Sequence, residues 1–180
     1  MQLPENAYVK TAVGLALLRD EILGPVAFDE AFREYTRRWA FKHPSPVDFF
    51  RTMENVSGKR LDFFFRQWFI ENAHFDQAID TVAEKQVGNV DSVAVLYANH
   101  ARGVMPIHVR FTFTDGSKQE FDYPVEVWST NTTFYVRQYE FKGKKMAKVE
   151  IDPDKRVPDL DRDNNMWPRE PAAPDGKKPH

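Results

Sequence analysis

Apolar residues recur at steps of three and four positions through the first seventy residues, which is the spacing of helices that bury one face. Gly24-Pro25 ends the first helical segment, because proline cannot continue a helix. Ser45-Pro46-Val47-Asp48 begins the third, with an N-cap serine, a proline at the first helical position and an acid at the third. Short connections between the segments favour a small helical bundle or array over residues 1–74. The apolar positions of the four expected helices are Tyr8, Ala12, Leu15, Ala16, Leu18 and Ile22; Phe28, Ala31, Phe32, Tyr35 and Trp39; Phe49, Phe50, Met53 and Val56; and Leu61, Phe64, Phe65, Trp68 and Phe69.

The hydrophobic period changes from 3.6 to 2 after about residue 75, which indicates strands. Asp115-Gly116 is a strong hairpin turn between two alternating runs, Ile107–Phe113 and Phe121–Val127. Six or seven short antiparallel strands over residues 75–160 predict a small β-sandwich of the immunoglobulin-like type, and the whole chain is then α+β. The remaining strand-like runs are 78–84, 93–97, 134–136 and 147–151. Residues 161–180 are rich in Asp, Asn, Pro and Lys, and we expect a flexible tail there.

The amino-acid composition and the net charge exclude several kinds of function for this chain. Of the 180 residues 42% are hydrophobic and 14% aromatic, so the chain can bury a real core. A net charge of −2 provides no broad positive field for nucleic acid, and no apolar run approaches the ~20 residues of a membrane span. The absence of cysteine excludes a thiol nucleophile, a disulfide and a cysteine-ligated metal within the chain. Met1 is not followed by the basic and apolar stretches of a signal peptide.

Motifs of complete hydrolytic sites are missing from the sequence. No two of the five histidines stand four residues apart, so there is no H-E-x-x-H helix face. Neither a G-x-S-x-G elbow nor a phosphate-binding loop is present. The histidines are His43, His74, His100, His108 and His180. We therefore expect neither metal nor cofactor in this chain, with one weak exception.

That exception is an acidic segment near the end of the chain. Asp159, Asp161, Asp163 and Glu170 stand at the first, third, fifth and twelfth positions, as the oxygen ligands of a calcium loop do. Against calcium, Pro168 lies inside the loop and no amphipathic helix flanks it. The segment is either a weak calcium site or a solvated acidic turn that caps the sandwich.

The helical half resembles a known family. The stretch "AYVKTAVGLALLRDEILGPVAFDEAFREYTRRWAFKHPSPVDFFRTMENVSGKRLDFFFRQWF" resembles the segment that follows the zinc site in the gluzincin aminopeptidases, of the aminopeptidase N and leukotriene hydrolase type. Shared features are a Tyr-x-Lys that opens an apolar helix, Leu-Gly at its end, Pro-x-Asp-Phe at a later helix start, and Ser-Gly before a final Phe- and Trp-rich helix. Thr11 departs from the pattern, since the family often has a smaller residue there.

The resemblance implies that residues 1–74 complete a thermolysin-like catalytic domain and that 75–160 form an accessory β-sandwich. The family's zinc ligands precede the Tyr-x-Lys helix, so the chain would be the C-terminal portion of a zinc metallopeptidase, inactive by itself, whose parent hydrolyses N-terminal peptide bonds. Tyr8 matches the family's catalytic tyrosine. A phenol remains protonated at neutral pH and donates to the oxyanion that develops on the scissile carbonyl. Lys10 also matches the motif, without an implied catalytic role.

The resemblance also implies partners, namely the missing N-terminal catalytic lobe and, for the parent, zinc and peptide substrates. A periplasmic or secreted parent fits by analogy only. The cut would leave apolar surface exposed on the first helix, which predicts self-association. The alternative is a non-enzymatic module, a helical array joined to an immunoglobulin-like domain that binds a protein or a carbohydrate.

Overall fold

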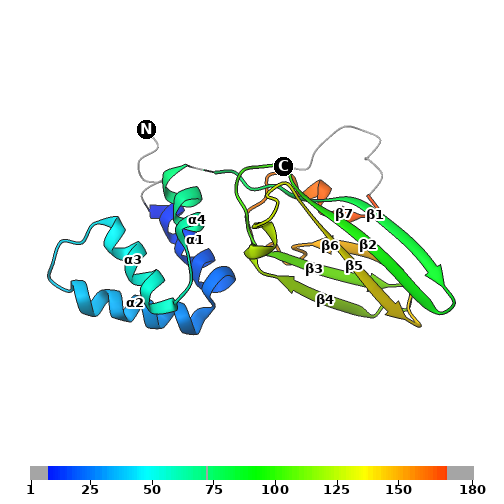
Figure 1. Ribbon diagram of the computed structural model, residues 1–180, viewed down its shortest axis with the longest axis horizontal. Helices are drawn as coiled ribbons and strands as arrows, with labels where there is room; N and C mark the ends of the chain where they lie inside the picture. The colour runs from blue at the N-terminus through cyan, green and yellow to red at the C-terminus, as the bar shows by residue number, and fades with distance from the viewer. Residues whose placement is uncertain (1–7, 72, 170–180) are drawn as a thin grey trace. The chain divides into compact units, whose positions relative to one another are not determined.

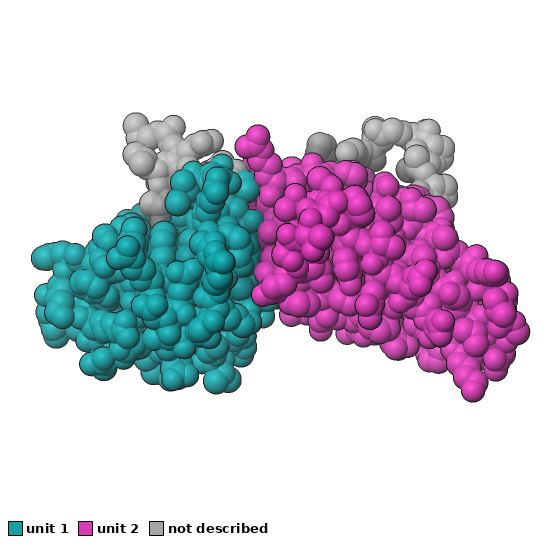
Figure 2. Space-filling model, in the orientation of Figure 1, with its two compact units in different colours: residues 1–73 teal, residues 74–180 magenta. Residues whose placement is uncertain are grey.

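The computed structural model describes residues 8–71 and 73–169. The chain forms two compact units, Met1–Ala73 (unit 1) and His74–His180 (unit 2), which Figure 2 distinguishes by colour. Unit 1 is helical and unit 2 consists of two antiparallel sheets (Figure 1), so the predicted α+β class with helices before a β-sandwich is confirmed. Within the described residues, no helix combines the length and the apolar character needed to span a membrane.

Unit 1 follows the sequence signals closely. Gly24 has a φ of 81° and separates the first helical segment from the second, which begins at Pro25. Gly58 adopts the left-handed conformation at the end of the third helix, as glycine does at many helix ends. The described helices are α1 (Lys10–Leu17), the π-helical turn η2 (Leu18–Leu23), α2 (Pro25–Trp39), α3 (Pro46–Ser57), α4 (Asp62–Phe65) and the π-helical turn η3 (Arg66–Ile70).

The start of α3 shows how a short motif fixes an element. The Asp48 carboxylate accepts hydrogen bonds from the Ser45 backbone N–H at 2.8 Å and from the Ser45 hydroxyl at 2.7 Å. Both hydrogen bonds lower the pKa of Asp48, and the bond from the Ser45 hydroxyl has the larger effect. Pro46 occupies the first helical position, where no N–H is needed.

Unit 2 is built from seven strands among the described residues. Sheet A has the order β1-β2-β5 and sheet B the order β4-β3-β6-β7. A β-bulge interrupts the β1–β2 ladder between Ile79 and Thr81. The strands are β1 (Gln77–Val87), β2 (Val90–Asn99), β3 (Ile107–Phe113), β4 (Lys118–Tyr123), β5 (Phe134–Lys142), β6 (Met146–Ile151) and β7 (Met166–Trp167).

The core of unit 2 lies between the inner faces of the two sheets, as in other sandwiches. Within this core three tyrosine hydroxyls form a chain. Tyr97 on β2 and Tyr139 on β5 are 2.7 Å apart at their hydroxyls, and Tyr123 on β4 donates to Tyr139 at 2.9 Å. The chain therefore joins sheet A to sheet B through buried polar atoms.

Two segments differ from the sequence expectations. The alternation through Val125 and Val127 predicts strand, but these residues form the 3₁₀ helix η4 (Val125–Trp128) directly after Pro124. Proline has no N–H for the ladder, so β4 ends at Tyr123.

The second segment is the end of the chain. The predicted flexible tail begins at residue 161, yet Met166–Trp167 form β7 against β6, and Arg169 donates to the Ile79 carbonyl. Residues 170–180 lie outside the described part of the chain.

Candidate functional site

Tyr8 stands immediately before α1 with its side chain 76% exposed. The neighbouring apolar side chains Val9 and Val13 are exposed as well. Residues four apart share one face of a helix, so these two valines form one apolar strip. Sequence spacing alone allows Tyr8 to be an aromatic at the edge of the helical core. Its high exposure instead leaves the phenol accessible from outside unit 1.

A close contact on the opposite side holds α1 in place. The indole N–H of Trp68 donates to the Lys10 carbonyl at 3.0 Å. Gly14, one turn further along α1, lies so near that an added β-carbon would be 2.2 Å from the Trp68 indole nitrogen. Phe64 stacks on the other side of this ring, with an interplanar angle of 3°. The contact fixes the helix that carries Tyr8.

A groove of about 720 Å³ opens on unit 1. Its walls are almost entirely apolar and aromatic, and its volume lies in the range of small-molecule sites. Phe49 meets Tyr35 edge to face with ring centroids 5.0 Å apart, which gives the wall a fixed shape. The lining residues are Thr11, Leu15, Phe32, Tyr35, Pro46, Val47, Phe49, Phe50, Phe69 and Ile70.

The acidic segment forms a turn that is attached to the start of β1. Asp159 accepts from the Gln77 N–H at 3.2 Å, from the Asp161 N–H at 3.0 Å and from the Asn165 side chain at 3.1 Å. Burial is the main cause that raises the pKa of Asp159. Asp161 in turn accepts from the Asp163 N–H at 3.2 Å. The turn thus uses these carboxylates for its own hydrogen bonds.

The remaining calcium candidate, Glu170, lies outside the described residues. Across residues 8–71 and 73–169, no group of three or more His, Asp or Glu side chains is placed to hold a metal ion. Calcium binding at this turn is therefore not among our proposals.

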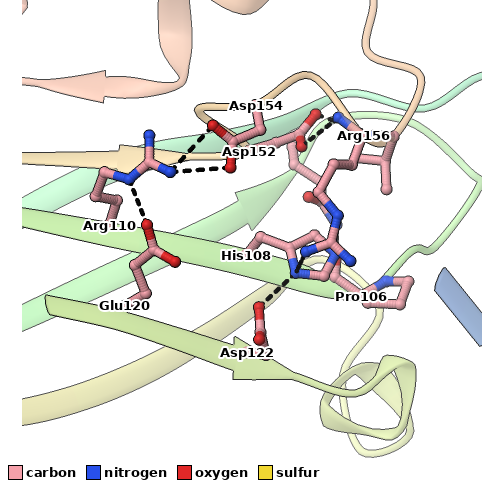
Figure 3. A network of polar contacts seen from close by, with 10 residues as sticks. Pro106, His108, Arg110, Glu120, Asp122, Asp152, Asp154 and Arg156 are labelled. Atoms are coloured by element: carbon pink, nitrogen blue, oxygen red, sulfur yellow. Dashed lines mark hydrogen bonds and ion pairs between the residues drawn. The ribbon is translucent and has the colours of Figure 1, made fainter. Parts of the chain in front are cut away.

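Polar side chains gather on the outer face of sheet B, where Figure 3 shows them. Arg110 on β3 donates through Nε to Glu120 on β4 at 2.6 Å. The same guanidinium donates to both carboxylate oxygens of Asp154, at 3.0 and 2.9 Å. The hydrogen bonds to Glu120 and Asp154 raise the pKa of Arg110, and the bond to Glu120 has the larger effect. The arginine is thereby held between two acids from different segments.

His108 occupies the neighbouring position of the same face. Its Nδ1 lies 2.6 Å from the Asp122 carboxylate and 3.3 Å from an Arg156 guanidinium nitrogen. A histidine oriented by a carboxylate is one part of many hydrolytic sites. Here the depression beside it has a volume of only about 40 Å³, which is room for a water molecule. This network connects β3, β4 and the segment after β6 on the surface of the sheet.

The comparisons with known proteins find likenesses only among solved structures. No protein-family model matches the sequence, and no curated protein matches it. Among solved structures, the chain resembles part of "Crystal structure of Legionella pneumophila aminopeptidase A in complex with aspartic acid", with a TM-score of 0.59 and 16% identity. The match covers 85% of this chain and 17% of that one. At this identity the likeness concerns the fold, and the chain spans about a sixth of the aminopeptidase.

Sequence reasoning named Tyr8 and the acidic turn as candidates, which stay predictions, and missed other features of these regions. Gly14 appeared only as a residue within an apolar helix, because nothing local shows that Trp68 packs on it. The alternating pattern of β3 did place His108 and Arg110 on the polar face of a strand. Their acidic partners on β4 follow from strand register, which the hairpin turn specifies only approximately.

Proposed function

We propose that this chain is the C-terminal portion of a zinc-dependent aminopeptidase-like metallopeptidase. The parent protein would hydrolyse N-terminal peptide bonds, and this portion would not be catalytic by itself. Residues 1–74 would complete the thermolysin-like catalytic domain, and residues 75–160 would form its accessory sandwich.

The main support for the proposal is the order of the two units along the chain. A helical unit followed by a β-sandwich shares its fold with a piece of an aminopeptidase over 85% of the chain. The helical unit also begins with the Tyr-x-Lys helix that opens the corresponding segment in the gluzincin family. The sequence motif and the fold likeness are separate observations, and both support the same assignment.

The chain's own residues do not fit a zinc ion. The described residues supply no group of three metal-ligating side chains, and the sequence has no H-E-x-x-H motif. The parent's zinc ligands would therefore come from the remainder of the longer protein. The contribution of this portion would be Tyr8, whose exposed phenol can donate a hydrogen bond to a carbonyl oxygen as negative charge develops on it.

The first test concerns the chain as it stands. The purified 180-residue protein is incubated with Zn²⁺ and a panel of aminoacyl p-nitroanilides, and release of p-nitroaniline is followed. We expect no turnover above the buffer rate, because the described residues hold no group of metal-ligating side chains and the sequence has no H-E-x-x-H motif. Zinc-dependent turnover that a chelator abolishes would overturn the assignment of catalysis to another part of the protein.

The second test concerns Tyr8 in the longer gene product. The coding sequence upstream is expected to encode H-E-x-x-H and a downstream Glu shortly before this tyrosine. In the protein so encoded, Tyr8→Phe should lower kcat by about 10²–10³ with little change in KM, because one oxyanion donor is lost. Val87→Ala, an exposed position in unit 2 and outside the apolar strip, is the control and should leave kcat unchanged.

An upstream region without a zinc motif would contradict the proposal and favour the non-enzymatic binding module. A zinc motif combined with an unaffected Tyr8→Phe variant would keep the assignment to the family and remove the role of Tyr8.

A further inference from the structure

Asp91 is a fully buried carboxylate at the hairpin end of the sandwich. It lies in β2, where alternate residues Val93, Val95 and Tyr97 also point into the core. Its Oδ2 accepts a hydrogen bond from the Met146 N–H on β6 at 2.8 Å, so the side chain connects sheet A to sheet B. Its Oδ1 is buried and has no hydrogen-bond donor. A buried ionised oxygen without a donor is costly, and this cost requires an explanation.

A candidate partner is Glu84 on the adjacent strand β1. Glu84 stands opposite Val93, and residues directly opposite in an antiparallel pair share a face, so Glu84 lies on the inner side with Asp91. Gln86 is directly opposite Asp91, which makes Glu84 its diagonal neighbour. Diagonal neighbours are within reach of long side chains. Glu84 is exposed on the edge strand β1, and its carboxyl group interacts with that of Asp91.

Two ionised carboxylates cannot form a hydrogen bond with each other, because each is an acceptor only. A single proton removes both difficulties, since it supplies the missing donor and cancels the repulsion of the two charges. We propose that Glu84 and Asp91 form a carboxylic acid–carboxylate pair that shares one proton and fastens the hairpin end of β1 and β2 more firmly in mildly acidic solution than in neutral solution.

The surroundings decide which group carries the proton. Asp91 retains the Met146 N–H as donor, which favours its charged form, whereas Glu84 has no comparable donor in the described residues. Burial, and then the charge of Asp91, raise the pKa of Glu84, while Lys145 acts in the opposite direction. Lys144, the other cation of this turn, donates to the Ser117 hydroxyl and lies over the Phe113 ring. Glu84 is therefore the acid of the pair.

The sign of the pH dependence follows. A carboxyl group whose pKa is higher in the folded than in the unfolded state binds its proton more tightly on folding. Its contribution to stability is complete below the unfolded pKa and is lost as the pH rises through the folded pKa. Unit 2 should therefore become more stable as the pH falls from 8 through the folded pKa of Glu84.

Glu84→Gln tests the pair in the full chain. The amide has the shape of the protonated acid and can donate to Asp91 Oδ1 at every pH. By calorimetry we expect the variant's Tm for unit 2 to exceed that of the wild type by about 2–6 °C at pH 8, with the difference closing as the pH falls towards 5. Glu140→Gln, which removes the same charge from an exposed position on β5, is the matched control and should follow the wild type.

Carboxyl ¹³C NMR provides a second readout that does not depend on unfolding. Glu84 should titrate above the ordinary range of glutamate, the direction in which its pKa is shifted. A Tm for Glu84→Gln that is equal to or below the wild type at pH 8, or a difference constant with pH, would overturn the proposal. Stabilisation of the wild type by Ca²⁺ that the variant lacks would also overturn it, in favour of a bound cation.

Discussion

Gly14 is a residue of unit 1 at which a larger side chain has no space. A β-carbon there would meet the indole of Trp68, which cannot move away without losing its hydrogen bond to the Lys10 carbonyl and its stacking on Phe64. Glycine in a helix ordinarily costs about 1 kcal/mol relative to alanine. At this position the close approach of the ring outweighs that preference.

We predict that Gly14→Ala lowers the free energy of unfolding of unit 1 by up to about 2 kcal/mol, since a clash of about 1–3 kcal/mol is offset by about 1 kcal/mol of helix propensity. Urea unfolding followed by far-UV circular dichroism measures the change. In the Trp68→Leu background the same substitution should be neutral or stabilising, because the obstructing ring is gone. Stabilisation in the wild-type background would show that the ring adapts freely.

At the level of elements, the hydroxyl chain of Tyr97, Tyr139 and Tyr123 connects three strands of the two sheets. Burial is the main cause that raises the pKa of both Tyr97 and Tyr139, so these two hydroxyls stay neutral throughout the ordinary pH range. Tyr139 is the middle member and contacts both others. Its removal leaves the fully buried Tyr97 hydroxyl without its partner.

Tyr139→Phe should therefore destabilise unit 2 by about 1–3 kcal/mol, the cost of an unsatisfied buried polar group. Tyr135→Phe on the same strand is the control. Its ring stacks on Tyr97, but its hydroxyl makes no hydrogen bond among the described residues, so the change should stay within about 0.5 kcal/mol. Denaturant unfolding of both variants gives the comparison, and equal effects would argue against the chain as a stabilising link.

The elements show what a single sequence can predict. Helix starts and ends were predictable because Ser45, Gly24 and Gly58 affect the backbone only at and next to their own positions in the sequence. Strand β7 was not, because two residues carry no periodic pattern and pair only through the register of β6. The same limit applies to the sites. Tyr8 was predicted from a motif and stays a prediction, whereas the Glu84–Asp91 pair depends on a cross-strand register that the sequence does not state.

At the scale of the whole molecule, exposed large apolar side chains are concentrated in unit 1. Val9 and Val13 on α1 are 61% and 44% exposed, and the walls of the groove add further apolar surface. Contiguous apolar surface of this kind promotes association between molecules. This surface fits a unit that packs against other parts of a larger protein, as our proposed function requires.

The isolated chain should self-associate at concentrations of about 10–100 μM, as measured by sedimentation velocity. Replacing both Val9 and Val13 by lysine should shift the chain towards monomer, because charges on the strip oppose its burial. Val87→Lys, an exposed valine in unit 2, should leave the distribution unchanged. A strictly monomeric wild type, or an unaffected double variant, would contradict this prediction.

The late position of β7 along the chain has a consequence for biosynthesis. Ribosomes add about 5–20 residues per second, and β7 begins fifteen positions after β6 ends at Ile151. The outer edge of β6 therefore has no partner strand for roughly 1–3 s after β6 has been made. During that interval a nascent chain is most open to pairing with a neighbour on the same messenger.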